Sequence, residues 1–170
     1  MAEPEELNLY WDFVNPGYDN DKSVMIRKNG RQFFKIQHYE TLTQYQGVFE
    51  RWNDIAQQWD EAGSTEWQGW RLKVIFGYHD QINQYKFSNK KSPTSKSRSF
   101  VWKDVVYKWK RIGEDGSMNC RVKVLGCRIV VSTWNETTKQ MVITPRGVPV
   151  TDRLIISLLY NRWLVAQKQW

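Results

Sequence analysis

Residues 24–36 run Val-Met-Ile-Arg-Lys-Asn-Gly-Arg-Gln-Phe-Phe-Lys-Ile, and this stretch predicts a β-hairpin. Asn29-Gly30 separates two runs that carry apolar residues, and both turn residues tolerate the positive φ that a two-residue hairpin turn requires. Before it, residues 7–14 predict a strand that ends at the turn formed by Asn15, Pro16 and Gly17. The chain therefore begins as antiparallel β-structure.

The next segment predicts an amphipathic helix. Residues 41–44, Thr-Leu-Thr-Gln, fit a capping box, and Gly63 is placed to end the helix. Trp52 and Trp59 are seven residues apart, so a helix would place both on one stripe that faces the core. The residues at helical three- and four-residue steps are Leu42, Tyr45, Val48, Phe49, Trp52, Ile55, Ala56 and Trp59.

The second half of the chain predicts more strands and a final helix. Pro149 and Thr151 predict the start of that helix, with Thr151 as the N-cap residue. Residues 154–166 are so apolar that the helix must be buried deeply or docked on a partner. The fold class predicted is α+β: a single domain over residues 1–170 with a mostly antiparallel β-sheet, one central amphipathic helix and one C-terminal helix. The strand-like segments are residues 67–78, 85–87, 100–112, 119–133 and 141–144, with a basic Ser-rich loop at 88–99.

Charge is distributed unevenly along these 170 residues, which carry a net charge of +7. Residues 1–85 have a net charge of −5, residues 86–128 of +9, and residues 129–170 of +3. Such an asymmetry indicates a surface that faces a polyanion, although acidic and basic segments could also pack together and cancel. Ten tryptophans add candidates for stacking or for interface anchors.

These features predict a non-catalytic protein that binds RNA or single-stranded DNA, such as a small accessory protein of a virus or mobile element. Aromatic and cationic residues alternate in residues 100–111, and could offer stacking faces beside charges for phosphates. In the alternative, one face of the strand is core and its cations form a solvated edge. Trp102 and Trp109 are seven apart, so a single strand would expose only one, and we expect Trp109. The predicted nucleic-acid-binding residues are Lys90, Lys91, Lys96, Arg98, Trp102, Lys103, Tyr107, Lys108, Trp109, Lys110 and Arg111.

A second hypothesis is a protein–protein adaptor or host-factor antagonist that acts through the C-terminal helix and exposed tryptophans. Interfaces favour Trp, Tyr and Arg as anchors. Self-association through the same helix would be a related outcome. The predicted partner-binding residues are Tyr160, Arg162, Trp163 and Trp170.

The sequence gives no support for catalysis, a cofactor or a metal site. Two cysteines and two histidines lack any usual metal-ligand spacing, and no phosphate-binding Gly-rich motif occurs. No secretion signal or apolar run of membrane-spanning length is present. We therefore expect an intracellular protein, cytoplasmic or nuclear, that is not secreted and has no membrane partner.

Overall fold

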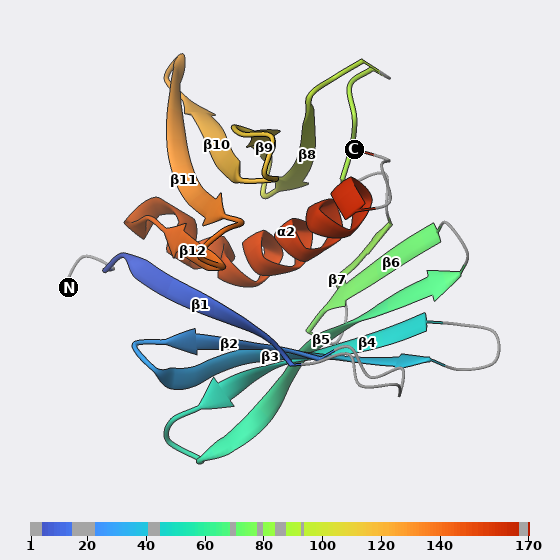
Figure 1. Ribbon diagram of the computed structural model, residues 1–170, viewed down its shortest axis with the longest axis vertical. Coiled ribbons are helices and arrows are strands. Elements are labelled where there is room, and N and C mark those ends of the chain that lie inside the picture. The colour runs from blue at the N-terminus through green and yellow to red at the C-terminus, as the bar shows by residue number, and fades with distance from the viewer. Residues whose placement is uncertain are drawn as a thin grey trace. The chain divides into compact units, whose positions relative to one another are not determined.

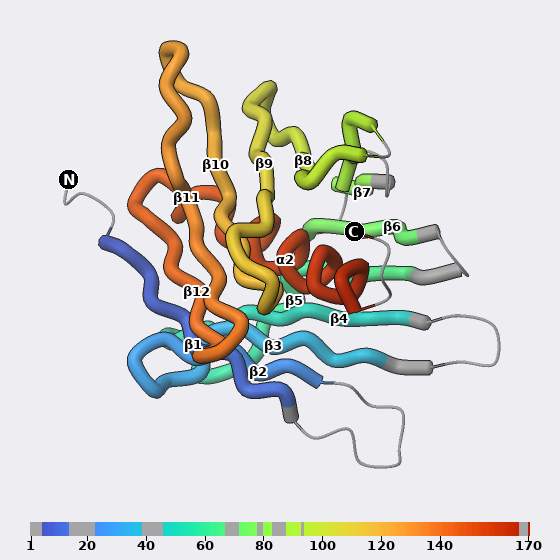
Figure 2. Tube along the Cα trace, turned by 45° about the horizontal axis from the view of Figure 1, so that its top comes forward, coloured from blue at the N-terminus to red at the C-terminus, as the bar shows by residue number. Residues whose placement is uncertain are grey.

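The chain forms two compact units in a computed structural model (Figures 1 and 2). Unit 1 comprises Met1–Leu9 and Tyr85–Trp170, and unit 2 comprises Tyr10–Gln84. Strand β1 (Leu7–Val14) contributes its first residues to unit 1 and the rest to unit 2. The prediction of a single domain stays a prediction. The residues that the structure describes are 5–14, 23–40, 45–68, 71–77, 80–83, 88–92, 94–166 and 170.

The predicted fold class is wrong, because the central helix does not form. Across the described residues, the chain is mostly antiparallel β-strand, with one α-helix near its C-terminal end. The segment predicted as the central helix instead supplies two strands of unit 2, and its capping box at residues 41–44 lies outside the described residues.

Unit 2 is an antiparallel sheet in the order β7-β6-β5-β4-β3-β2-β1. The hairpin predicted at Asn29-Gly30 is confirmed, with φ of 51° and 77° at these two residues. The other strands are β2 (Ser23–Lys28), β3 (Arg31–Glu40), β4 (Tyr45–Asn53), β5 (Gln58–Gln68), β6 (Arg71–Phe76) and β7 (Asp80–Asn83).

The seven-residue spacing of Trp52 and Trp59 is compatible with a hairpin as well as with a helix. Residues 54–57 form a turn, and the two tryptophans become direct partners across β4 and β5. Their ring centroids are 5.3 Å apart in an edge-to-face arrangement, which is favourable for aromatic pairs. Lys35 lies over the Trp59 ring and forms an ion pair with Glu50 at 2.7 Å. Cross-strand pairing therefore replaces the helical stripe.

Gly63, which was expected to end the helix, lies inside β5 beside a β-bulge. It pairs with Phe49 on one side and Phe76 on the other, and its φ is +151°. A Cβ at this position would lie 2.1 Å from the Ile75 carbonyl oxygen and 2.4 Å from the Phe49 ring. The close approach of the two neighbouring strands requires a glycine here.

The Gly63→Ala substitution tests whether this position lacks room for a side chain. At the end of a helix, where the terminating glycine has a left-handed backbone, alanine would cost roughly 1–2 kcal/mol. In β5 it should lower the free energy of unfolding by about 2 kcal/mol or more, and by more than the same change at Gly30, because it introduces both a clash and backbone strain. Urea unfolding measures this, with Gly30→Ala as the control, since Gly30 has a positive φ but open space around it. A more stable Gly63→Ala protein would contradict the strand.

Unit 1 contains a second antiparallel series of strands, in the order β1-β12-β11-β10-β9-β8, followed by its helix. A 3-10 helix, η1 (Pro145–Val150), runs directly into α2 (Thr151–Ala166). Thr151 is not the N-cap residue that we predicted, because its backbone is already helical and its hydroxyl donates to the Val148 carbonyl oxygen. The strands are β8 (Ser97–Trp102), β9 (Val105–Arg111), β10 (Met118–Val124), β11 (Cys127–Asn135) and β12 (Gln140–Ile143).

Two of the predicted long strands are hairpins. Lys103-Asp104 turns the chain between β8 and β9, with φ of 46° and 61°. Leu125-Gly126 turns it between β10 and β11, with φ of 48° and 84°. Positive φ at both central residues is the geometry that two-residue hairpins need. Gly126 therefore lies in the turn between β10 and β11.

Helix α2 lies against one face of strands β8–β11, which we name the inner face (Figure 1). Trp109 of β9 donates its indole N–H to the Ser157 hydroxyl at 2.9 Å, and Asn161 accepts a hydrogen bond from Ser88 at 3.1 Å. The opposite face of these strands is the outer face. Inner and outer positions alternate along each strand, which decides where the predicted site residues lie.

Candidate functional site

The aromatic residues of the predicted site belong to the inner face. Trp109 is 1% exposed, and Tyr107 is buried with its ring stacked on Phe100 at 4.9 Å. The expected exposure of Trp109 is therefore wrong. The turn at Lys103-Asp104 reverses the chain, so Trp102 and Trp109 lie on neighbouring strands and on the same face.

Burial also sets the protonation of this face. It raises the pKa of the Tyr107 phenol, with a further contribution from Cys120. It raises the pKa of the buried Cys120 thiol well above its usual value. Both groups therefore stay protonated at neutral pH, and Cys120 is not placed to act as a thiolate nucleophile.

Several predicted cations contact groups within unit 1. Lys90 donates to the Trp170 carbonyl oxygen at 3.0 Å, and the Arg98 guanidinium lies over the Trp170 ring. Burial lowers the pKa of Arg98. Trp102 is half-buried, with the Lys103 ammonium group 4.6 Å and the Arg153 guanidinium 5.8 Å from its ring centroid. Arg111 donates to the Glu114 carbonyl oxygen.

The outer face carries the charges that remain available to a ligand. Lys108 and Lys110 are exposed there, next to each other along β9. Lys91 and Lys96 are exposed in the loop before β8. The structure thus separates Tyr107 and Trp109 from Lys108 and Lys110, because the two pairs alternate along β9 and lie on opposite faces of the sheet.

Strand pairing adds three cations that sequence reasoning missed. Arg121 of β10 lies directly opposite Lys108, and Lys123 of β10 lies directly opposite Arg128 of β11. The sequence contains a signal for two of these cations. Arg121 and Lys123 alternate with valines that are buried or half-buried, in the same way as Lys108 and Lys110 alternate with aromatic residues, and this alternation predicts one charged face. We name these five residues the cationic face: Lys108, Lys110, Arg121, Lys123 and Arg128.

The cationic face forms a diagonal band of about 16 Å across three strands, from ordinary strand spacings. Like charges directly opposite each other destabilise a sheet. The pairs Lys108–Arg121 and Lys123–Arg128 have this unfavourable arrangement. In the part of the chain that the structure describes, none of the five forms an ion pair. The band is therefore an uncompensated positive surface.

The residues predicted to bind a protein partner are held within unit 1. Tyr160 is buried and stacks on the half-buried Trp163 at 6.0 Å. Arg162 forms two hydrogen bonds with the Glu136 carboxylate, at 2.8 and 2.7 Å, and lies over the Trp134 ring. These contacts show what the anchors do inside the fold, and they leave the adaptor hypothesis without a specific supporting observation.

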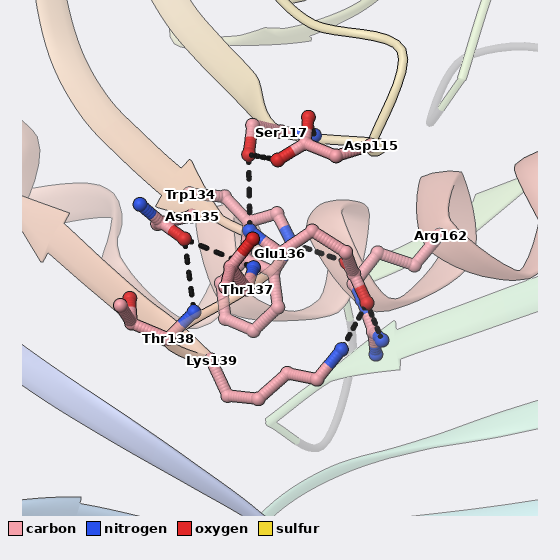
Figure 3. A network of polar contacts seen from close by, with 9 residues as sticks. All are labelled: Asp115, Ser117, Trp134, Asn135, Glu136, Thr137, Thr138, Lys139 and Arg162. Atoms are coloured by element: carbon pink, nitrogen blue, oxygen red, sulfur yellow. Dashed lines mark hydrogen bonds and ion pairs between the residues drawn. The ribbon is translucent and has the colours of Figure 1, made fainter.

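Glu136 is the centre of a polar network that ties α2 to the turn between β11 and β12 (Figure 3). Its carboxylate also accepts hydrogen bonds from the Trp134 indole N–H and from Lys139. Burial alone would raise the pKa of Glu136, but the hydrogen bonds from Arg162, Lys139 and Trp134 and the Arg162 charge lower it to about 2. The network therefore has a structural role, and within it the positive charge of Arg162 is paired with the Glu136 carboxylate.

Comparison with known proteins gives no family for this chain: no protein-family model, curated protein or solved structure matches it. Among the described residues, no group of three or more His, Cys, Asp or Glu side chains is placed to hold a metal ion. No helix within the described ranges is long and apolar enough to span a bilayer.

The Glu136→Gln substitution should remove a pH-dependent part of the stability. The pKa of Glu136 in the folded protein lies below its ordinary value of 4.5, so the carboxylate stabilises the fold above pH 4.5 and loses that effect as the pH falls toward 2. We expect a contribution on the order of 2 kcal/mol, reduced from the full pKa shift because solvent screens part of it.

Urea unfolding of both proteins between pH 7 and pH 3 provides the test. The difference in stability should be largest near pH 7 and shrink toward pH 3, because below pH 4.5 the unfolded parent binds a proton at Glu136 that the folded parent does not bind. A difference that stays constant over this range would show that the carboxylate charge does not hold α2.

The Ser157→Ala substitution tests the buried contact between the sheet and α2. It leaves the Trp109 indole N–H without its acceptor, and we expect a loss of about 1–3 kcal/mol in the free energy of unfolding. Ser92→Ala, at an exposed loop position, is the control and should change stability by less than about 0.5 kcal/mol. Equal stability of the two variants would contradict the structural role of this hydrogen bond.

Proposed function

We propose that this protein is a non-catalytic nucleic-acid-binding protein that uses the cationic face of β9–β11. One observation carries the proposal: five cations from three strands share one outer surface, with like charges directly opposite each other. This arrangement destabilises the sheet on its own, and a polyanion that neutralises the charges would relieve the repulsion.

Affinity would come from neutralising phosphates and would depend steeply on salt. All five charges lie within about two Debye lengths at 0.1 M salt, so they would act together on one ligand. Lys91 and Lys96 of the preceding loop would add to the same field. The proposal places the protein in the cytoplasm or nucleus, where an exposed thiol such as that of Cys127 stays reduced.

The double substitution Lys108→Thr/Lys123→Thr tests the cationic face. Threonine suits a strand, so the fold should be retained while two phosphate contacts are lost. In a plot of log K against log salt concentration, the slope should become shallower by about 1.4–2, together with weaker binding at low salt. Fluorescence anisotropy with labelled 20-mers across a salt series measures both quantities.

A matched control removes the same amount of charge elsewhere. Arg31→Thr/Arg146→Thr changes two exposed arginines that do not belong to the cationic face and leaves the same net charge as the test variant. If both double variants bind alike, the cationic face is not the binding site. If the parent protein binds no nucleic acid at 50 mM salt, the proposed function is wrong.

A further inference from the structure

The tip of the β10–β11 hairpin carries a residue that the fold does not explain. Leu125 is 100% exposed and has a φ of +48°. Turns of this kind favour Asn, Asp or Gly at that position, because other side chains are strained at positive φ. In the part of the chain that the structure describes, the strain at Leu125 is therefore not offset by burial of its side chain.

The hairpin also projects as a two-stranded ribbon. The last described pair between β9 and β10 is Tyr107 with Val122, whereas β10 and β11 continue through two more pairs, Lys123 with Arg128 and Val124 with Cys127. Figure 2 shows this hairpin extending to its tip in the upper part of the view. An exposed leucine thus stands at the end of a ribbon whose base carries two cations.

The outer face lacks what single-strand binding needs. Base stacking on aromatic rings supplies much of the affinity for single strands, and the rings of Phe100, Tyr107 and Trp109 lie on the inner face. A double helix is already ordered and carries one charge per about 1.7 Å of its axis, so fixed cations can bind it without stacking. The outer face therefore suits a duplex better than a single strand.

We propose, as an extension of the proposed function, that the β10–β11 ribbon enters the minor groove of a nucleic-acid duplex and inserts Leu125 against a base step. Apolar wedges of this kind partly unstack a step and bend the duplex, while flanking lysines and arginines contact the backbone. Lys123 and Arg128 flank the turn on its two strands, and the rest of the cationic face continues the phosphate contacts.

The Leu125→Asn substitution separates the wedge from the fold. Asparagine suits the positive φ of the turn, so the hairpin should be at least as stable as in the parent. The control is Ile55→Asn, which changes another aliphatic residue that is almost fully exposed at a hairpin tip, at 98%. Thermal melts establish that both variants fold.

Binding and bending are then measured on 20-mer DNA and RNA duplexes labelled at both ends for energy transfer, and on the corresponding single strands. The parent and Ile55→Asn should bend a duplex by roughly 20–90°. Leu125→Asn should lose the bend and bind about tenfold or more weakly, with an unchanged salt slope because no charge is removed.

The outcomes distinguish this inference from the proposed function. Unchanged bending and affinity for Leu125→Asn, or tighter binding of single strands than of duplexes by the parent, would overturn the wedge while leaving the cationic face in place. Binding to no nucleic acid would overturn both. Leu125-dependent binding to vesicles of anionic lipid, without binding to any duplex or single strand, would assign the tip to a membrane surface and would also overturn both.

Discussion

The packing of α2 against the inner face of β8–β11 is the contact on which the arrangement of unit 1 depends. It buries Trp109 and Tyr107 and leaves the opposite side of the same strands to solvent. Because side chains alternate along a strand, burying one set of positions determines which residues face outward. The positive surface is thus a consequence of the core: Lys108 and Lys110 face solvent because Tyr107 and Trp109 do not.

The predictable part of the fold was local. Asn29-Gly30 predicts its hairpin from turn chemistry alone. Lys103-Asp104 and Leu125-Gly126 form the same kind of turn, but their residue types predict it only weakly. The central helix was predicted wrongly because Trp52 and Trp59 suit a helical stripe and a cross-strand pair equally well. Spacing alone does not separate these two structures, and pairing with a neighbouring strand decided between them.

The candidate site was predictable only in part, for a related reason. The excess of positive charge in residues 86–128 indicated the segment that carries the cationic face, and Lys108 and Lys110 were identified from the sequence. Arg121 and Arg128 are distant from them in sequence and join them only through strand register. Trp109 was expected to be exposed because cations surround it in the sequence, but Lys108 and Lys110 lie on the opposite face of β9. Sequence composition therefore located the charge, and topology determined its neighbours.

The discontinuity of unit 1 has a consequence for synthesis of the chain. Residues 10–84 of unit 2 separate the first strand of unit 1 from the remainder, and α2 is made after all the strands that it covers. At roughly 5–20 residues per second, about 3–11 seconds pass between the emergence of Trp109 and that of Ala166. During that interval the inner face of β8–β11 has no helix to cover it. A nascent chain at this stage exposes an aromatic sheet surface and is therefore prone to aggregation until α2 covers it.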